Sequence, residues 1–599
     1  MALTVLRKSG VAGDDTPPEQ VSELLATTTY DGIALAPLYT ADTVVPAAGL
    51  PGLAPFVRGG HPLGAVVGGW DVRQRHAHPD PAVSRQEIAA DLDNGVTSVW
   101  LALGDGYPGP DALPDLLADV RLDLAGVVLD AGGQTAAAAA GFLELVQARG
   151  VATDAVTGNL GADPLGARVR TGAPLDLAVV STLAARTAAG FPGLRAVLVD
   201  ATPYHDAGGS DAEELGCALA TGVAYLRALV DGGLDQVAAL GQLEFRYAVT
   251  ADQFLSIAKL RAARRLWARV AEVCGVPAAG AQRQHAVTSS AMMTARDPWV
   301  NILRTTLAGF AAAVGGADSV TVTPFDACLG LSDTSARRIA RNTQALLLDE
   351  SHLGRVLDPA GGSWYVEHLT EDLARAAWAW FTEIERAGGM AAALDSGLVA
   401  QRLDATWAAR VRNIRYRRDA LTGVSEFPNL TEQLPLRPPA PVPANTGLLP
   451  TRRYAAVFET FRDAADAHAA ATGARPTVFL ATLGPVAAHT ARAAFATNLF
   501  ASGGIAAVTS GTSTDPTEIA EAFTKSGLTV ACLCGTDRTY GEKATEVATA
   551  LAAAGAKRVW LAGKPADYGG VDSYLFAGCD AAAVVESALS DLEVGAEQS

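Results

Sequence analysis

Residues 97–103 read TSVWLAL, a short apolar run with the length and composition of a buried β-strand. Similar runs return at LAGVVL (124–129), LRAVLV (194–199) and SVTV (319–322), with Ala-rich amphipathic segments between them. Parallel strands need helical crossovers, so this repeated pattern over residues 51–430 predicts about eight βα units. A domain of this size and pattern is most simply a closed (β/α)₈ TIM barrel with added helices.

A second α/β domain follows the barrel. The Pro-rich stretch LPLRPPAPVP (434–443) predicts an extended segment, so we expect residues 431–472 to form a linker with one helix. Strand-like runs then return at TVFLAT (477–482), IAAV (505–508), LTVACL (528–533) and RVWLA (558–562). Their spacing by helices predicts a flavodoxin-like doubly wound domain over residues 473–599. Residues 1–50 are too few for a domain and form an N-terminal arm.

The composition is that of a globular protein: of 599 residues, 49% are hydrophobic and 18% are charged. The net charge of -18 argues against nucleic acid as a partner, because phosphate-backbone binding draws on Lys and Arg. Six cysteines in this length predict no disulfide framework, and Cys532 and Cys534 are expected in the core. No stretch resembles a membrane span or a secretion signal, so we expect a cytoplasmic protein without membrane contact.

Three polar segments of the barrel region stand out. AKLRAARRLW (258–267) is helical, with its apolar residues on one stripe, and its basic residues favour a solvated face, with anion binding as the alternative. DTSARRIARNTQ (333–344) pairs a capping residue with a second basic helix. DPAGGSWY (358–365) has the composition of a turn.

Taken in this order, these segments resemble the barrel of the cobalamin-dependent methylmalonyl-CoA mutase family. PFVRG (55–59), TGNLGADPLG (157–166) and DPWVNILR (297–304) extend the resemblance along the arm and barrel. The resemblance implies an acyl-CoA that threads the barrel axis and a C-terminal domain that presents cobalamin at the carboxyl face of the barrel.

The loop TLGPVAAH (482–489) departs from the family pattern. The family carries Lys and then Asp-x-His-x-x-Gly after the first strand of this domain, and the His coordinates cobalt. Thr482 stands where the Lys is expected, no Asp precedes His489 at the required spacing, and His489 falls one position late. Losing the groups that orient a ligating His weakens the metal bond, so we predict no metal ligand and no bound cobalamin in this chain.

At the positions of the family's site residues, this barrel changes one residue type and keeps others. Arg75 ends WDVRQR (70–75), where the family has an active-site Tyr. A long cation there brings water and charge into a site that should be dry, although it could instead bind an anion. His205 matches the His that hydrogen-bonds the substrate thioester, but a structural role fits equally well. Arg283 and His285 lie where the family contacts CoA.

Radical mutases of this family can pair a catalytic chain with a similar chain that has lost its cofactor site. The resemblance implies that this chain is of the second kind, a non-catalytic small subunit in a heterodimer. The resemblance implies that its partner is the large catalytic subunit, which would hold adenosylcobalamin and interconvert methylmalonyl-CoA and succinyl-CoA, and that the N-terminal arm would contact this partner. Two alternatives are an active acyl-CoA mutase that binds cobalamin without a histidine, and an acyl-CoA-binding protein that works alone.

Overall fold

Eight parallel strands close into a barrel in the computed structural model of this chain, which describes residues 2–42, 45–64, 66, 68–441 and 446–594. Each strand pairs with the next one along the chain, and the last pairs with the first. The strands are β3 (Asp71–His76), β4 (Ser98–Ala102), β5 (Gly126–Asp130), β6 (Gly158–Ala162), β7 (Leu194–Asp200), β8 (Leu243–Val249), β9 (Arg283–Thr288) and β10 (Ser319–Thr321). The predicted TIM barrel is confirmed, and the run at 97–103 is β4.

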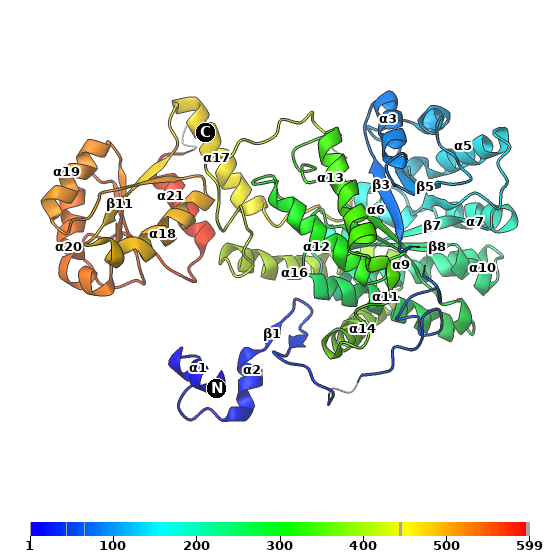
Figure 1. Cartoon of the computed structure of the whole chain (residues 1–599), viewed down its shortest axis with the longest axis horizontal. Coiled ribbons are helices and arrows are strands. Elements are labelled where there is room, and N and C mark those ends of the chain that lie inside the picture. The colour runs from blue at the N-terminus through cyan, green and yellow to red at the C-terminus, as the bar shows by residue number, and fades with distance from the viewer. Residues whose placement is uncertain (1, 43–44, 65, 67, 442–445, 595–599) are drawn as a thin grey trace. The chain divides into compact units, whose positions relative to one another are not determined.

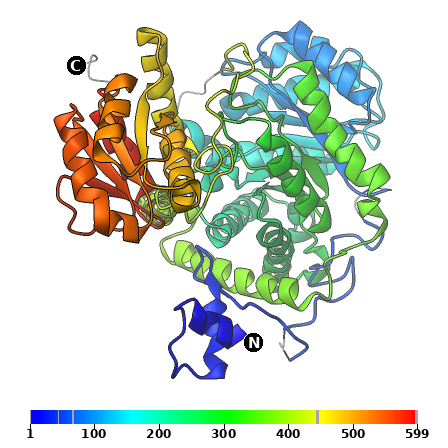
Figure 2. The ribbon, with the colours of Figure 1, turned by 60° about the vertical axis from the view of Figure 1, so that its left-hand side comes forward.

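Helices connect the barrel strands, and further helices follow the last strand (Figures 1 and 2). They are α3 (Pro81–Leu92), α4 (Leu113–Leu116), α5 (Thr135–Ala148), α6 (Pro164–Thr171), α7 (Ala178–Gly190), α8 (Thr202–Asp206), α9 (Asp211–Asp231), α10 (Gln236–Gly241), α11 (Gln253–Val273), α12 (Val300–Val314), α13 (Thr334–Ala345), α14 (Trp364–Arg386), α15 (Met390–Asp395) and α16 (Leu398–Arg415). The predicted cap of the second basic helix is present, since Asp333 accepts a hydrogen bond from the Ala336 N–H at the start of α13.

Helix α9 shows how the sequence fixes a helix next to the barrel mouth. Ser210 and Glu213 form a reciprocal capping box at its first turn, and such caps contribute about 1 kcal/mol each. Glu214, one residue further on, is fully buried. The helix start therefore places a fixed carboxylate beside the carboxyl end of the barrel.

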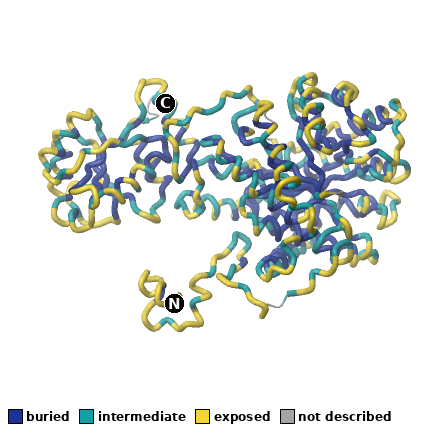
Figure 3. The backbone as a smooth tube through the Cα atoms, viewed as in Figure 1, coloured by how far each residue is buried: buried dark blue, intermediate teal, exposed yellow. Residues whose placement is uncertain are grey.

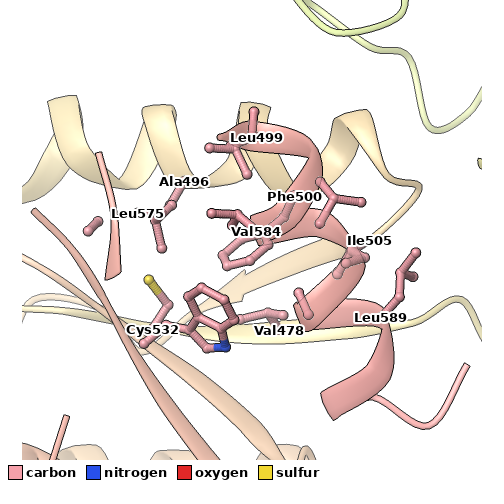
Figure 4. Packing of buried hydrophobic residues seen from close by; sticks show 14 of the residues in the cluster. Val478, Ala496, Leu499, Phe500, Ile505, Cys532, Leu575, Val584 and Leu589 are labelled. Atoms are coloured by element: carbon pink, nitrogen blue, oxygen red, sulfur yellow. The ribbon is translucent and has the colours of Figure 1, made fainter. Parts of the chain in front are cut away.

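The C-terminal sheet is parallel, with the strand order β12-β11-β13-β14-β15 of a flavodoxin-like fold. Its elements are β11 (Thr477–Thr482), α18 (Val486–Ser502), β12 (Ala506–Thr509), α19 (Pro516–Ser526), β13 (Val530–Cys534), α20 (Asp537–Ala553), β14 (Arg558–Ala562), β15 (Ser573–Leu575) and α21 (Ala581–Asp591), preceded by α17 (Ala456–Thr472). Figure 4 shows Cys532 in the apolar core of this domain, and Cys534 is equally buried. The predicted core position of both thiols is confirmed.

The chain forms two compact units that interleave in sequence. The first comprises Met1–Met292, Ile302–Trp407 and Arg437–Arg452, and the second comprises Met293–Asn301, Ala408–Leu436 and Arg453–Ser599. The predicted boundaries at residues 50, 430 and 472 stay predictions. Of the Pro-rich stretch, Val442 and Pro443 lie outside the described residues, and Arg437 is held to the barrel unit by ion pairs with Asp326 and Asp333.

The N-terminal arm carries α1 (Ala2–Lys8), α2 (Val21–Leu25) and a two-stranded ribbon of β1 (Thr27–Thr28) and β2 (Ala34–Leu35). Most of its described residues are exposed (Figure 3), including the apolar side chains of Val5, Val11 and Leu38. Its end is attached to the barrel unit, because Asp31 accepts a hydrogen bond from the Ala212 N–H.

Candidate functional site

A cavity of about 430 Å³ lies at the carboxyl end of the barrel strands, where TIM-barrel proteins place their active sites. Its volume is in the range of small-molecule sites. Its charged lining residues are Arg75, Glu87, Asp130, Arg170, Asp200, Asp206 and Arg337. Charged side chains of both signs therefore line the barrel mouth.

Arg75 lies in the wall of this cavity, near the end of β3. Its guanidinium carbon is 5.1 Å from the ring centroid of Trp100 and 5.8 Å from that of Tyr107. Cation–π contacts of this kind orient a guanidinium without neutralising it. The structure thus places the sequence-predicted cation at the barrel mouth, resting on two aromatic rings.

Below the mouth, an ion pair crosses the barrel interior. Arg73 on β3 reaches Glu244 on β8, with 2.5 Å between Nη1 and Oε1, and also contacts Asp71 at 3.1 Å and the Ser98 hydroxyl at 3.0 Å. The Arg73 and Glu244 residues are each only 1% exposed. Burial raises the pKa of Glu244, but the charges of Arg73 and Arg283 outweigh it and bring that pKa down to about 2. The Arg73 and Glu244 side chains are therefore both charged, and they lie on the axis of the barrel.

A second layer fills the axis between this pair and the cavity. Arg246 on β8 pairs with Asp200 at 2.9 Å and stacks 3.9 Å from the ring centroid of Trp100. Its Nε donates to Nδ1 of His285 at 3.2 Å, and Nε2 of His285 lies 2.8 Å from the Thr321 hydroxyl. Side chains from five strands therefore meet at the centre of the barrel.

Arg283 and His285 share strand β9, and neither lines the cavity at the mouth. His285 is fully buried in the axial layer, where burial and the charges of Arg73 and Arg246 hold its pKa well below the usual value. Arg283 is half-buried at the opposite end of the strand, with its Nε 3.8 Å from Glu244. The structure places both residues in or beside the interior charge network.

His205 lies on α8, directly after strand β7, and is 3% exposed. Its Nε2 is 2.6 Å from the hydroxyl oxygen of Ser289, and its Nδ1 is 3.7 Å from a carboxylate oxygen of Glu214. Ser289 lines the cavity, while His205 stands behind it. The sequence-predicted histidine is thus at the barrel mouth, joined to a serine and a carboxylate.

In the C-terminal domain, Thr482 ends strand β11 and is fully buried. Its hydroxyl donates to the carbonyl oxygen of Gly511, and its N–H donates to the Ser510 hydroxyl at 2.9 Å. Gly484 continues the connection by donating to the Ser513 carbonyl. The loop after β11 is tied to the loop after β12 by the chain's own groups, and no ammonium group stands at the position of Thr482.

His489 lies in the first turn of α18, three residues after the helix starts. Neither of its ring nitrogens makes a hydrogen bond with a described residue. A cobalt-ligating imidazole is oriented by a carboxylate on its other nitrogen, and the structure gives His489 no such partner among the described residues. These residues do not fit a histidine-ligated cobalamin.

Comparison with known proteins supports the family that the barrel motifs resemble. Residues 111–469 match the family model described as methylmalonyl-CoA mutase. The chain belongs to the methylmalonyl-CoA mutase family. It is 59% identical over 98% of its length to the methylmalonyl-CoA mutase small subunit of Streptomyces virginiae, of which it covers 95%, and 40% identical over 94% of its length to the small subunit of Propionibacterium freudenreichii subsp. shermanii, of which it covers 90%.

A mutase large subunit is also similar to this chain. The identity to the methylmalonyl-CoA mutase large subunit of Streptomyces virginiae is 32% over 67% of this chain and 59% of that subunit. The chain is thus similar to mutase subunits of both sizes, and the match to small subunits is higher and longer. In the described part of this mutase-family chain, no helix has the length and apolar character that crossing a membrane requires.

One expectation was wrong: the basic helix at 258–267 does not carry a solvated basic face. Helix α11 packs against α9 and α14, and Lys259, Arg261 and Arg264 are at most 1% exposed. Each is paired inside the protein: Lys259 with Asp211 and Glu214, Arg261 with Asp358 and Glu367, and Arg264 with the carbonyls of Val57 and Gly315. Buried charges need such partners. In this mutase-family barrel the basic residues hold segments together.

Sequence reasoning also missed the axial network of Arg73, Glu244 and Arg246. The signal was in the sequence, because Asp71, Arg73 and Arg75 alternate along β3, as Glu244 and Arg246 do along β8. Alternate residues of a strand share one face, so the charged side chains of each strand point to the same side of the sheet. Which face they share, the interior or the helix layer, follows only from the closed barrel.

Proposed function

We propose that this chain is the non-catalytic small subunit of a heterodimeric methylmalonyl-CoA mutase. The large subunit would hold adenosylcobalamin and carry out the interconversion of methylmalonyl-CoA and succinyl-CoA. This chain would contribute an interface and stability to the complex. The high identity to proteins named as small subunits supports membership in a mutase complex, and the site geometry supports the non-catalytic role.

The main support for the non-catalytic role is that side chains fill the barrel axis. The family resemblance implies that an active chain passes acyl-CoA along the axis, and here Arg73 and Glu244 close that path. Breaking a buried ion pair by removing one partner costs about 3–5 kcal/mol, so a substrate that displaces the pair must supply a comparable free energy. The Arg246–Asp200 pair adds a second barrier above the first.

The C-terminal domain supports the same role. Thr482 and the loop around it are hydrogen-bonded within the domain, and His489 has no orienting carboxylate among the described residues. We therefore propose that this chain binds no cobalamin. We place the contact with the large subunit at the N-terminal arm, where apolar side chains such as Val5 and Leu38 are exposed.

Titration of the isolated chain with adenosylcobalamin and methylmalonyl-CoA tests this proposal. We expect no saturable binding of the cofactor and no turnover, with turnover appearing only when the large subunit is present. Saturable binding with turnover by the isolated chain would instead favour an active mutase. Failure to co-purify with a large subunit, together with acyl-CoA binding, would favour a protein that works alone.

A further inference from the structure

Three side chains at the barrel mouth form a nucleophile, base and carboxylate series. The Ser289 hydroxyl oxygen is 2.6 Å from Nε2 of His205, and Nδ1 of His205 is 3.7 Å from Oε2 of Glu214. Serine, histidine and acid in this order are the arrangement that activates a serine for acyl transfer. The acid-to-histidine distance is long for a hydrogen bond, as is common in such sites without substrate.

The carboxylate end of the series is fixed in place. Glu214 is fully buried, and Oε1 accepts the Ala248 N–H at 2.8 Å while Oε2 lies 2.7 Å from the Lys259 ammonium. We assign the proton of His205 to Nδ1, the ring nitrogen on the side of Glu214. Nε2 is then free of its proton and accepts the hydrogen bond of the Ser289 hydroxyl, which is the tautomer that a general base requires.

The nucleophile end borders the cavity at the barrel mouth, although Ser289 itself is only 1% exposed. Ser289 lines the cavity of about 430 Å³, which suits a small molecule. In the described part of the chain, the backbone N–H of the next residue, Ser290, makes no hydrogen bond. A donor directly after the nucleophile is a common source of the oxyanion hole. Cavity, nucleophile, base and donor therefore converge at the end of β9.

We propose that Ser289 is the nucleophile of an esterase activity on short-chain carboxylic esters, with His205 as its general base and Glu214 as a positioning residue. The Ser289 oxygen forms a bond to the ester carbonyl carbon, and its proton passes to Nε2 of His205. The carbon–oxygen bond to the alcohol breaks, and the alcohol leaves with that proton. Water then attacks the acyl-serine through the same base, releasing the carboxylic acid and restoring Ser289. This activity is separate from the mutase role.

Labelling of the full chain with a fluorophosphonate probe tests the nucleophile. We expect the probe on Ser289, located by mass spectrometry, and no labelling at that position in S289A. The matched control is S526A, which changes an exposed serine at the end of α19 outside the cavity and should still be labelled at Ser289. S289C, which preserves the size of the side chain, should be alkylated by iodoacetamide at that position. Absence of probe on Ser289 in a folded wild-type chain overturns the proposal.

Hydrolysis of p-nitrophenyl acetate tests the base and the positioning residue. We expect kcat/KM to fall at least about a hundredfold in S289A and H205Q. E214Q should lower kcat with KM unchanged, because the carboxylate acts through His205 and does not touch the ester. Lys259 keeps Asp211 as a partner in that variant, 2.8 Å away. Wild-type rates in S289A would overturn the proposal, as would a change in KM alone in E214Q.

Discussion

Arg73 and Glu244 meet across the interior of the barrel, with 2.5 Å between their charged groups and almost no solvent at either. The two residues come from β3 and β8, which are not neighbours in the barrel. Their pairing therefore spans the space that a threaded substrate would occupy. This contact links the fold of the chain to its proposed loss of catalysis.

E244Q should destabilise the chain strongly, because it leaves the Arg73 guanidinium buried with only Asp71 as an acidic partner. We expect a loss of about 3–5 kcal/mol in the free energy of unfolding of the barrel unit. Urea denaturation followed by tryptophan fluorescence measures this loss. D123N, which breaks the exposed Arg121–Asp123 pair, is the matched control and should leave the midpoint unchanged. Equal midpoints for both variants would show that the axial pair is not structural.

The same carboxylate predicts a pH dependence of stability. The pKa of Glu244 falls from its usual 4.5 to about 2 in the folded chain, so its contribution is complete above pH 4.5 and is lost as pH falls toward 2. The stability difference between wild type and E244Q should therefore be constant from pH 8 to pH 5 and shrink below that. Denaturation series at several pH values measure it, and a difference that grows on acidification contradicts the assigned charge state.

The fold could be predicted from the sequence because apolar runs such as 97–103 repeat with helical spacing. The buried thiols of Cys532 and Cys534 followed from the same reasoning. The roles of Arg261 and Arg264 could not be predicted, because charge patterns favour solvent unless the partner, such as Asp358, is known to be close in space. Those partners lie far away in sequence and meet only in the closed barrel.

R75Y should not confer mutase activity. The change restores the residue type of the family at this position, but Arg73, Glu244 and Arg246 still fill the axis below it. We expect the isolated variant to bind no methylmalonyl-CoA by calorimetry and to show no turnover with added adenosylcobalamin. If R75Y alone produced turnover, Arg75 and not the axial network would be the block.

T482V should weaken the C-terminal domain. The substitution keeps the shape of the side chain but removes the Thr482 hydroxyl that donates to the Gly511 carbonyl, and losing such a hydrogen bond costs about 0.5–1.5 kcal/mol. Thermal unfolding of the full chain measures the effect. T490V, on the exposed side of α18, is the control and should unfold like wild type. Equal unfolding of T482V and T490V would mean that the hydroxyl does not hold the two loops together.

The cobalamin content of the purified complex tests the non-catalytic role most directly. The chain should co-purify with a mutase large subunit, and the corrinoid released from that complex can be quantified against the amounts of both chains. Because the loop from Thr482 to His489 lacks the groups that hold cobalt, we predict one adenosylcobalamin per heterodimer, retained when His489 is changed to Ala. Two cofactors per heterodimer, with one lost in H489A, would contradict the account.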